Sequence, residues 1–253
     1  MVFTFLIGIC IGSFLNVVVY RLPLNINMAK GRSFCPKCKT TLQPLDLVPI
    51  FSWVFLGAKC RYCKEKIAFQ YPFVELLTGI FFVLFYLKYG FTIDFFRIIF
   101  LVSLLIVISI IDIKEQYIYD ITIIIGVICT GILLVGDALL NNDVIVGYII
   151  SAVVTGLIYY ILHFVTKKMY GDEVFGLGDV FLGILIGINT PVNLLYYTIC
   201  LPFIVGLVVI IFVKIKSIFM KTNFESRVPF GPFMAASCII LLFFDKYFEH
   251  LLF

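Results

Sequence analysis

Four cysteines in the first quarter of the chain have a spacing that is typical of a metal site. Cys35 and Cys38 are separated by two residues, as are Cys60 and Cys63, and 21 residues lie between the two pairs. Each such pair presents two thiolates on a tight turn, and two pairs complete a tetrahedron around Zn²⁺ with Zn–S bonds of about 2.3 Å. The four residues therefore predict a structural zinc site, with two disulfides or a redox pair as the alternatives.

Four acidic residues stand at the edges of long apolar runs, where an ionisable group is costly and often functional. Asp112 follows the apolar run 98–111, and Asp179 follows two closely spaced glycines. Asp120 and Glu75 are expected in the first turns of helices, where the helix dipole favours a carboxylate. That placement is sufficient to explain Asp120. For Glu75, the same explanation and a supporting role in a functional site carry equal weight.

Asp112 and Asp179 are the strongest candidates for chemistry. Asp112 is expected at a helix C-terminus, where the dipole disfavours a negative charge, so it needs a partner, a proton or solvent. Gly176 and Gly178 let the helix that carries Asp179 bend and approach a neighbouring backbone. Two aspartates at the same depth on different helices could share one proton. The ionised carboxylate would then activate water while the neutral one polarises a peptide carbonyl, as in aspartic proteases.

The elements that must position these residues are membrane helices. Of the 253 residues, 62% are hydrophobic and 13% are charged, against about half and about a quarter in soluble domains. This composition excludes a soluble single domain and a disordered chain, and the eight cysteines are too sparse for a secreted disulfide scaffold. We expect an all-α polytopic membrane protein with about eight transmembrane helices, near residues 2–20, 72–88, 95–111, 118–136, 144–165, 175–189, 192–213 and 228–245.

Basic residues predict the orientation of these helices. Sixteen of the 19 Lys and Arg residues fall in alternate connections, namely 21–71, 112–117, 166–174 and 214–227. The positive-inside rule places these connections in the cytosol and both termini outside. The four acidic residues then lie at cytosolic helix ends. The topology itself is the main explanation of the basic loops, and attraction to anionic lipid head groups is the secondary one. The lipid bilayer is the expected partner of the chain, and nothing in the sequence suggests nucleic acid.

Three regions are expected from this pattern. Residues 1–20 form the first transmembrane helix, 21–71 form a small cytosolic zinc-binding module, and 72–253 form a seven-helix membrane core. Only 21–71 is polar enough to lie outside the membrane. Because a segment of about 50 residues has too small a hydrophobic core to hold itself together, a metal staple is expected there.

Together, these features resemble the type IV prepilin peptidases (prepilin leader peptidases and N-methyltransferases), which are membrane aspartyl proteases of the GxGD type. The resemblance covers nearly the whole chain, because the matching motifs follow the family's order from residue 8 to 233. The motifs are Gly12-Ser-Phe-Leu-Asn-Val-Val-Val-Tyr-Arg-Leu-Pro23, the two cysteine pairs, Tyr71-Pro-Phe-Val-Glu-Leu-Leu77, Gly176-Leu-Gly-Asp179 and Val228-Pro-Phe-Gly-Pro-Phe233.

The resemblance implies that Asp112 and Asp179 are catalytic, with Gly176, Gly178 and Glu75 in supporting positions. It also implies cleavage of a short basic leader after a glycine in type IV prepilins or secretion pseudopilins, at the cytosolic face of the bacterial cytoplasmic membrane. Many members then methylate the new N-terminus with S-adenosylmethionine. No familiar nucleotide-binding glycine loop occurs in the chain, so no residue is assigned to that cofactor.

The sequence departs from the family at two positions. Tyr119 stands where the family often has proline, and Phe181 stands where it often has lysine, which removes a cation near Asp179. His163 and His250, near the ends of apolar runs, are expected to be interfacial.

Two other functions remain open. A carboxylate-coupled transporter would favour acidic residues at the membrane midplane and internal repeats, and neither pattern is visible. An inactive zinc-stapled scaffold would leave the two aspartates unexplained. The sequence does not fix the oligomeric state.

Overall fold

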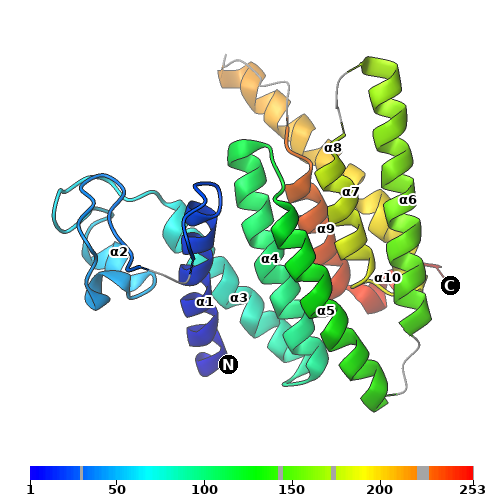
Figure 1. The fold of residues 1–253 in the computed structure, drawn as a ribbon, viewed down its shortest axis with the longest axis horizontal. Coiled ribbons are helices and arrows are strands. Elements are labelled where there is room, and N and C mark those ends of the chain that lie inside the picture. Colours follow the sequence, from blue (N-terminus) through cyan, green and yellow to red (C-terminus); the bar gives the residue numbers. More distant parts are fainter. Residues whose placement is uncertain (29–30, 142–144, 172–174, 221–227, 253) are drawn as a thin grey trace. The chain divides into compact units, whose positions relative to one another are not determined.

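The computed structural model describes residues 1–28, 31–141, 145–171, 175–220 and 228–252, and its contacts divide the chain into two compact units, Met1–Phe91 and Thr92–Phe253 (Figure 1). Regular structure in the described residues consists of helices and two isolated β-bridges, so the all-α fold class is confirmed. Lys30, Lys221 and Arg227, which contributed to the predicted orientation, lie outside the described residues, as does residue 144.

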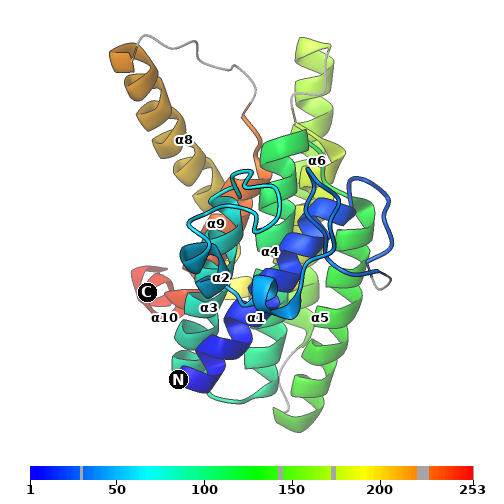
Figure 2. The same ribbon diagram turned by 90° about the vertical axis from the view of Figure 1, so that its left-hand side faces the viewer.

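Unit 1 contains two long helices and the segment that joins them. Helix α1 spans Val2–Arg21 and helix α3 spans Gln70–Tyr89. Between them lie the 3₁₀ helix η1, Pro44–Leu47, and the short helix α2, Phe51–Phe55. Helices α1 and α3 pack side by side (Figure 2).

A glycine sets the close approach of α1 to α3. A Cβ atom on Gly12 would lie 2.7 Å from the Cα of Glu75, so only glycine fits at this crossing. One turn later, the Asn16 side-chain amide donates hydrogen bonds to the carbonyl oxygens of Gly12, at 3.3 Å, and Tyr71, at 3.1 Å. Small residues that let backbones meet and polar residues that bond across helices are the usual means of association in a membrane.

Unit 2 is a bundle built around α4. Helix α4 has the largest buried share of the long helices, because it packs against both α5 and α9. Helix α7 packs against α5, α6 and α9, and α8 packs against α9. The bounds are α4 Ile93–Glu115, α5 Asp120–Asn141, α6 Ile145–Tyr170, α7 Leu177–Gly187, η2 Val192–Leu194, α8 Leu195–Met220, α9 Gly231–Phe243 and α10 Asp245–Leu252.

Fewer helices span the full membrane thickness than the eight that were expected. Six described helices are long and apolar enough to cross a membrane: α1, α3, α4, α5, α6 and α8. Helix α7 has only 11 residues, or about 17 Å at 1.5 Å per residue, against a hydrocarbon core of about 30 Å. Helices α9 and α10 qualify only as one span bent by 84°, because they have only 13 and 8 residues, respectively. The number is therefore six, or up to seven, in a multi-pass membrane protein.

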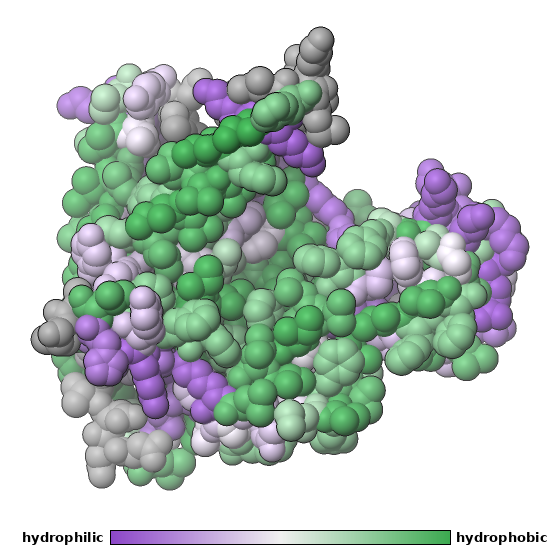
Figure 3. Space-filling model, turned by 180° about the vertical axis from the view of Figure 1, so that it is seen from behind, coloured by the Kyte–Doolittle hydropathy of each residue, from purple (hydrophilic) through white to green (hydrophobic). Residues whose placement is uncertain are grey.

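The exposed faces of these helices are apolar. Phe96 of α4, Ile132 of α5, Leu157 of α6 and Phe212 of α8 are each more than half exposed. Hydrophobic residues cover the helix faces, whereas hydrophilic residues gather at helix ends and on the segment between α1 and α3 (Figure 3). A surface of this kind requires lipid, because soluble proteins rarely expose apolar patches of such extent.

Buried polar side chains fix the C-terminal end of α7. The Asn189 side-chain amide donates to the Leu185 carbonyl oxygen at 2.9 Å and to the Thr130 hydroxyl of α5 at 3.0 Å. The guanidinium of Arg97 in α4 donates to the Asn189 side-chain oxygen at 3.3 Å and to Asp94. Because these groups are removed from water, each unmade bond would be costly. The short helix is thereby tied to α4 and α5.

Candidate functional site

The four predicted cysteines of unit 1 come together in one cluster. Their sulfur atoms all lie within 4.8 Å of one another, and all four thiols are free. Cys35 Sγ lies 3.9 Å from Cys63 Sγ, close to the ~3.8 Å between two corners of a tetrahedron with 2.3 Å Zn–S bonds. Four thiols at this spacing could hold a metal ion, and sulfur ligands of this kind suit Zn²⁺.

Two similar turns present the thiols. In the first, Cys35 N–H donates to the Thr40 carbonyl oxygen at 2.9 Å, and Lys39 N–H donates to the Cys35 carbonyl oxygen at 2.8 Å. The second turn repeats this pattern around Cys60, whose N–H donates to the Glu65 carbonyl oxygen at 2.8 Å. These local bonds close each Cys-x-x-Cys turn, which explains why sequence spacing alone located the cluster.

The thiols differ in their affinity for protons. Hydrogen bonds from the hydroxyl and backbone N–H of Thr40 lower the pKa of Cys38 to about 6. A backbone N–H of Cys63 likewise lowers the pKa of Cys60. At Cys63 the backbone N–H of Glu65 stabilises the thiolate, but burial and the neighbouring thiols outweigh it and raise the pKa to about 11. The cluster thus collects negative charge that a bound cation would neutralise.

Asp112 lies in the last turn of α4, where its own helix dipole disfavours the negative charge. Its side chain is 5% exposed, and its Oδ2 accepts a hydrogen bond of 2.9 Å from the backbone N–H of Gly231. Gly231 is the first residue of α9, so the carboxylate faces a second helix at its N-terminus. The dipole of α9 therefore supplies the partner that the sequence could not identify.

Asp179 lies in the first turn of α7 and is held in a similar way. Its Oδ2 accepts a hydrogen bond of 3.2 Å from the backbone N–H of Gly176. Gly178 allows α7 to pack tightly, because a Cβ atom there would lie 2.9 Å from the Cβ of Ile118, just before α5. The hydrogen bond from Gly176 and the close packing at Gly178 together fix the Asp179 carboxyl group at the N-terminal end of α7.

An aromatic contact in unit 2 connects the two segments that hold the aspartates. Phe175 and Phe230 each precede a glycine that donates its backbone N–H to a carboxylate, and their ring centroids lie 5.5 Å apart. Carboxyl groups that lie near each other in a partly buried environment interact more strongly than they would in solvent.

Sequence reasoning missed two residues of this site. Gly231 stands in the quoted Pro-Phe-Gly-Pro motif, but nothing in the sequence indicated which carboxylate its N–H would meet. His163 was expected to be interfacial, and that expectation is wrong. It is 6% exposed, and its Nδ1 lies 2.6 Å from the carbonyl oxygen of Phe175. His163 thus holds the segment that leads into Gly176.

The remaining predicted residues lie elsewhere. Glu75 belongs to unit 1, is 7% exposed, and accepts a 2.6 Å hydrogen bond from the backbone N–H of Ile50. Asp120 is exposed at the start of α5, in agreement with its role at a helix N-terminus. Phe181 is 43% exposed, and the Tyr119 hydroxyl donates to Glu115 at 3.0 Å.

Comparisons with known protein families agree with the two structural units. Residues 6–89 match the model described as the bacterial peptidase A24 N-terminal domain, within unit 1. Residues 99–211 match the type IV leader peptidase family, within unit 2, and include both aspartates. No solved structure matches the chain.

Individual relatives extend this similarity. The chain is 35% identical over 186 residues to a prepilin leader peptidase/N-methyltransferase of Myxococcus xanthus, a match that covers 74% of this chain and 55% of that protein. It is 32% identical over 196 residues to a type 4 prepilin-like proteins leader peptide-processing enzyme of Escherichia coli, covering 69% and 71%. A prepilin leader peptidase/N-methyltransferase of Pseudomonas aeruginosa is 29% identical over 274 residues, covering 96% and 90%.

The chain spans about half the length of the Myxococcus relative but most of the Pseudomonas one. The segments that match the two family models contain the cysteine cluster of unit 1 and Asp112 and Asp179 of unit 2. On these grounds, the chain belongs to the type IV leader peptidase family.

Proposed function

We propose that this protein is a membrane aspartic endopeptidase that removes the leader peptide from type IV prepilins or pseudopilins and then N-methylates the new N-terminus. The observation that carries the proposal is the pair Asp112 and Asp179, on separate helices, each held by a backbone N–H from a glycine. A carboxylate-coupled transporter is not favoured, because the relatives in the comparisons are named as leader peptidases.

The proposed reaction uses the two carboxyl groups in different protonation states. Like charges held close together favour a pair that shares one proton. The ionised carboxylate takes a proton from water, and the neutral one donates a hydrogen bond to the scissile carbonyl oxygen. Water oxygen then bonds to the carbonyl carbon, the C–N bond breaks, and the departing amine takes up a proton. The amine is the new N-terminus of the pilin.

The proposed orientation follows from the basic connections. The segment 22–69 carries exposed Lys and Arg side chains between two membrane helices. The positive-inside rule places this segment and the ends of α4 and α7 that carry the aspartates on the cytosolic side of the bacterial cytoplasmic membrane, with the N-terminus outside. The proposed position of the C-terminus, also outside, requires an even number of crossings, as in the count of six. A leader peptide with basic residues would be presented on that side. The region boundaries 1–20, 21–71 and 72–253 remain part of this proposal.

Zinc is the proposed metal of the cysteine cluster. Cys35, Cys38, Cys60 and Cys63 would hold it, and four protein ligands leave no position for substrate, so its role is structural. S-adenosylmethionine is the proposed methyl donor. It supplies an electrophilic methyl group to the amine that cleavage exposes.

The direct test incubates the purified protein with a synthetic prepilin peptide, with and without S-adenosylmethionine, followed by mass spectrometry. We expect cleavage after the leader glycine in both samples and a gain of one methyl group only when the donor is present. An intact peptide under conditions in which the protein is folded and zinc-loaded would contradict the peptidase assignment. A cleaved but unmethylated peptide would contradict the methyltransferase assignment alone.

Gly231→Ala should impair cleavage more than stability. The added Cβ atom would lie 2.6 Å from Asp112 Oδ2, the end of a side chain that can rotate away. We expect the cleavage rate to fall by about 10²-fold, because a displacement of about 1 Å in a reacting group has effects of that size. Gly131→Ala in α5 is the matched control, since its Cβ would meet nothing within 4 Å. Equal cleavage rates for Gly231→Ala and Gly131→Ala would show that Gly231 does not position a group that takes part in the reaction.

A further inference from the structure

The peptide group between Phe175 and Gly176 is held on both sides. Its N–H donates a hydrogen bond of 3.2 Å to Oδ2 of Asp179. Its carbonyl oxygen lies 2.6 Å from Nδ1 of His163, which belongs to helix α6. Because a carbonyl oxygen can only accept a hydrogen bond, Nδ1 carries the hydrogen. An imidazole N–H, one peptide group and one carboxyl group thus form a continuous row of hydrogen bonds.

The geometry of a peptide group transmits this contact. A peptide group is rigid and planar, and its C=O and N–H point in opposite directions. The bond from His163 therefore fixes the direction of the Gly176 N–H as well as that of the carbonyl. A donor at the carbonyl oxygen also polarises the peptide group, which strengthens the hydrogen bond that the N–H makes. In this way the imidazole acts on the Asp179 carboxyl group through the peptide group between them.

Helix α6 holds the imidazole in place. His163 is 6% exposed, and Tyr159, one turn earlier on the same face of α6, is 1% exposed. The ring of Tyr159 lies 5.7 Å from the ring of Phe175, measured between centroids. Further along the two helices, a Cβ atom on Gly187 of α7 would lie 2.7 Å from the Cα of Ala152 of α6. Close backbone packing therefore sets the position of the imidazole relative to α7.

The equivalent peptide group at the other aspartate is held by its own helix. It joins Phe230 to Gly231 and donates its N–H to Asp112. Its carbonyl oxygen accepts the backbone N–H groups of Phe233, at 3.0 Å, and Met234, at 3.2 Å. These bonds form with the first turn of α9, whereas at the start of α7 a side chain from α6 holds the carbonyl. The aspartate on α7 therefore depends on a contact between helices.

We propose that His163 is a positioning residue for Asp179, which it orients through the peptide group between Phe175 and Gly176. The inference rests on the proposed peptidase function and adds a residue to its site. In this role His163 exchanges no proton with the substrate. It keeps the N–H of Gly176 directed at the carboxyl group, so that this group stays where the water and the scissile carbonyl meet it. The role requires a hydrogen-bond donor at the place of Nδ1.

Two substitutions of His163 distinguish a hydrogen-bond donor from a side chain that only fills space. His163→Asn puts an amide N–H near the place of Nδ1, whereas His163→Leu has no donor. In His163→Leu we expect kcat for leader-peptide cleavage to fall by about 10- to 10²-fold and KM to change by less than about twofold, because small displacements of a reacting group have effects of this size. His163→Asn should cleave about fivefold faster than His163→Leu, the effect of one recovered hydrogen bond.

Thr155→Val is the matched control on the same helix. Thr155 is fully buried, and its hydroxyl has no hydrogen-bond partner among the described residues, so valine removes a polar group without breaking a bond. Its kcat should equal that of the natural protein, and its unfolding temperature should be equal or higher. An equal loss of kcat in Thr155→Val and His163→Leu would overturn the proposal. A raised KM with an unchanged kcat in His163→Leu would also overturn it.

The hydrogen bond can be tested without any cleavage, because the chain has two histidines, His163 and His250. Nitrogen NMR of the full-length protein in detergent, with ¹⁵N-labelled histidine, reports which ring nitrogen carries the hydrogen. His250→Gln assigns the two signals. At mildly alkaline pH, where free imidazole is neutral, we expect the hydrogen of His163 on Nδ1. A bare Nδ1 would overturn the proposal, and this measurement decides even if His163→Leu does not fold.

Failure of this inference and failure of the proposed function have different signs. If the natural protein cleaves the prepilin peptide and folded His163→Leu cleaves it with the same kcat, the positioning role fails while the proposed function stands. If the natural, folded protein leaves the peptide intact, the proposed function fails and the positioning role fails with it. The unfolding temperature reports whether each variant is folded.

Discussion

Asp112→Asn and Asp179→Asn should each lower the rate of leader-peptide cleavage by about 10²- to 10⁴-fold, the range for loss of a general acid or base. Asparagine keeps the shape of the side chain and an oxygen that can accept the N–H of Gly231 or Gly176. It cannot take a proton from water, and it cannot carry the proton that the pair shares. The measurement is the initial rate of cleavage of a prepilin peptide by purified protein in detergent.

The two variants should remain folded. Replacing one of two neighbouring carboxylates relieves repulsion, so we expect the unfolding temperature to stay the same or rise slightly. Asp120→Asn is the matched control, because this aspartate begins α5 and is exposed. Its cleavage rate should equal that of the natural protein. Normal cleavage by either Asp112→Asn or Asp179→Asn would show that the reaction does not depend on the pair.

Removal of zinc should unfold the segment between α1 and α3. Structural zinc contributes about 10–16 kcal/mol to the folding of small zinc-binding peptides at pH 7. In the described residues of the segment 22–69, regular structure consists of η1, α2 and two isolated β-bridges, so a small core is left to hold the segment together without the metal. We expect the natural protein to contain one zinc ion per chain, and limited proteolysis after treatment with a chelator to cut within 22–69.

Single cysteine substitutions test whether the bound zinc, and not cysteine in general, stabilises the segment between α1 and α3. Cys60→Ser should lose the zinc and become sensitive to protease between α1 and α3, since Cys60 is 4% exposed and supplies one of four ligands. Cys10→Ser is the matched control within unit 1, because Cys10 lies on α1 and is exposed. A Cys60→Ser variant that retains one zinc ion per chain would contradict the four-thiolate site.

The cysteine cluster and the long helices were predictable because the contacts that define them are local. Each Cys-x-x-Cys turn closes with hydrogen bonds over four or five residues, and each apolar run satisfies its own backbone groups. The same local rules placed α7 within two residues at each end, at 175–189, but counted it among the spanning helices, for which its 11 residues are too few. An apolar run does not show where its helix ends, and the helix ends at Gly187, two residues before Asn189 is held by Arg97 and Thr130.

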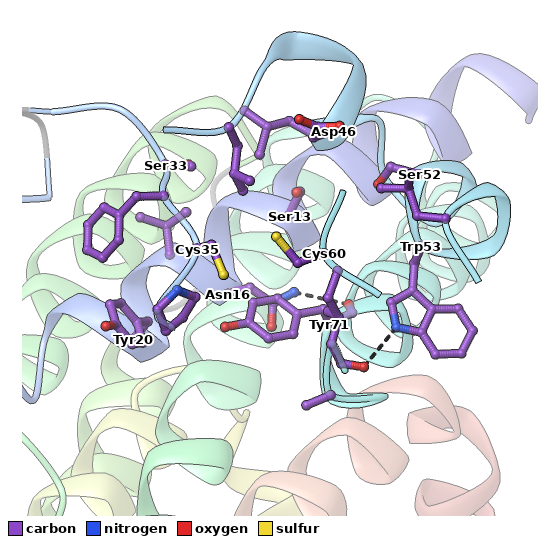
Figure 4. A pocket seen from close by; sticks show the side chains of 18 of the residues that line it. Ser13, Asn16, Tyr20, Ser33, Cys35, Asp46, Ser52, Trp53, Cys60 and Tyr71 are labelled. Carbon is purple, nitrogen blue, oxygen red and sulfur yellow. Dashed lines mark hydrogen bonds between the residues drawn. The ribbon is translucent and has the colours of Figure 1, made fainter. Parts of the chain in front are cut away.

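The sequence by itself singled out the residues that are proposed to carry the chemistry: the four cysteines by their spacing, and Asp112 and Asp179 by the scarcity of charge beside apolar runs. Only the tertiary structure decided what holds them. The N–H of Gly231 meets Asp112 across 119 positions of the chain, and the side-chain amide of Asn16 meets the carbonyl oxygen of Tyr71 across 55 positions (Figure 4). These contacts arise where separate segments pack together. Such contacts leave no periodicity in the sequence, because either partner alone is an ordinary glycine, asparagine or aromatic residue.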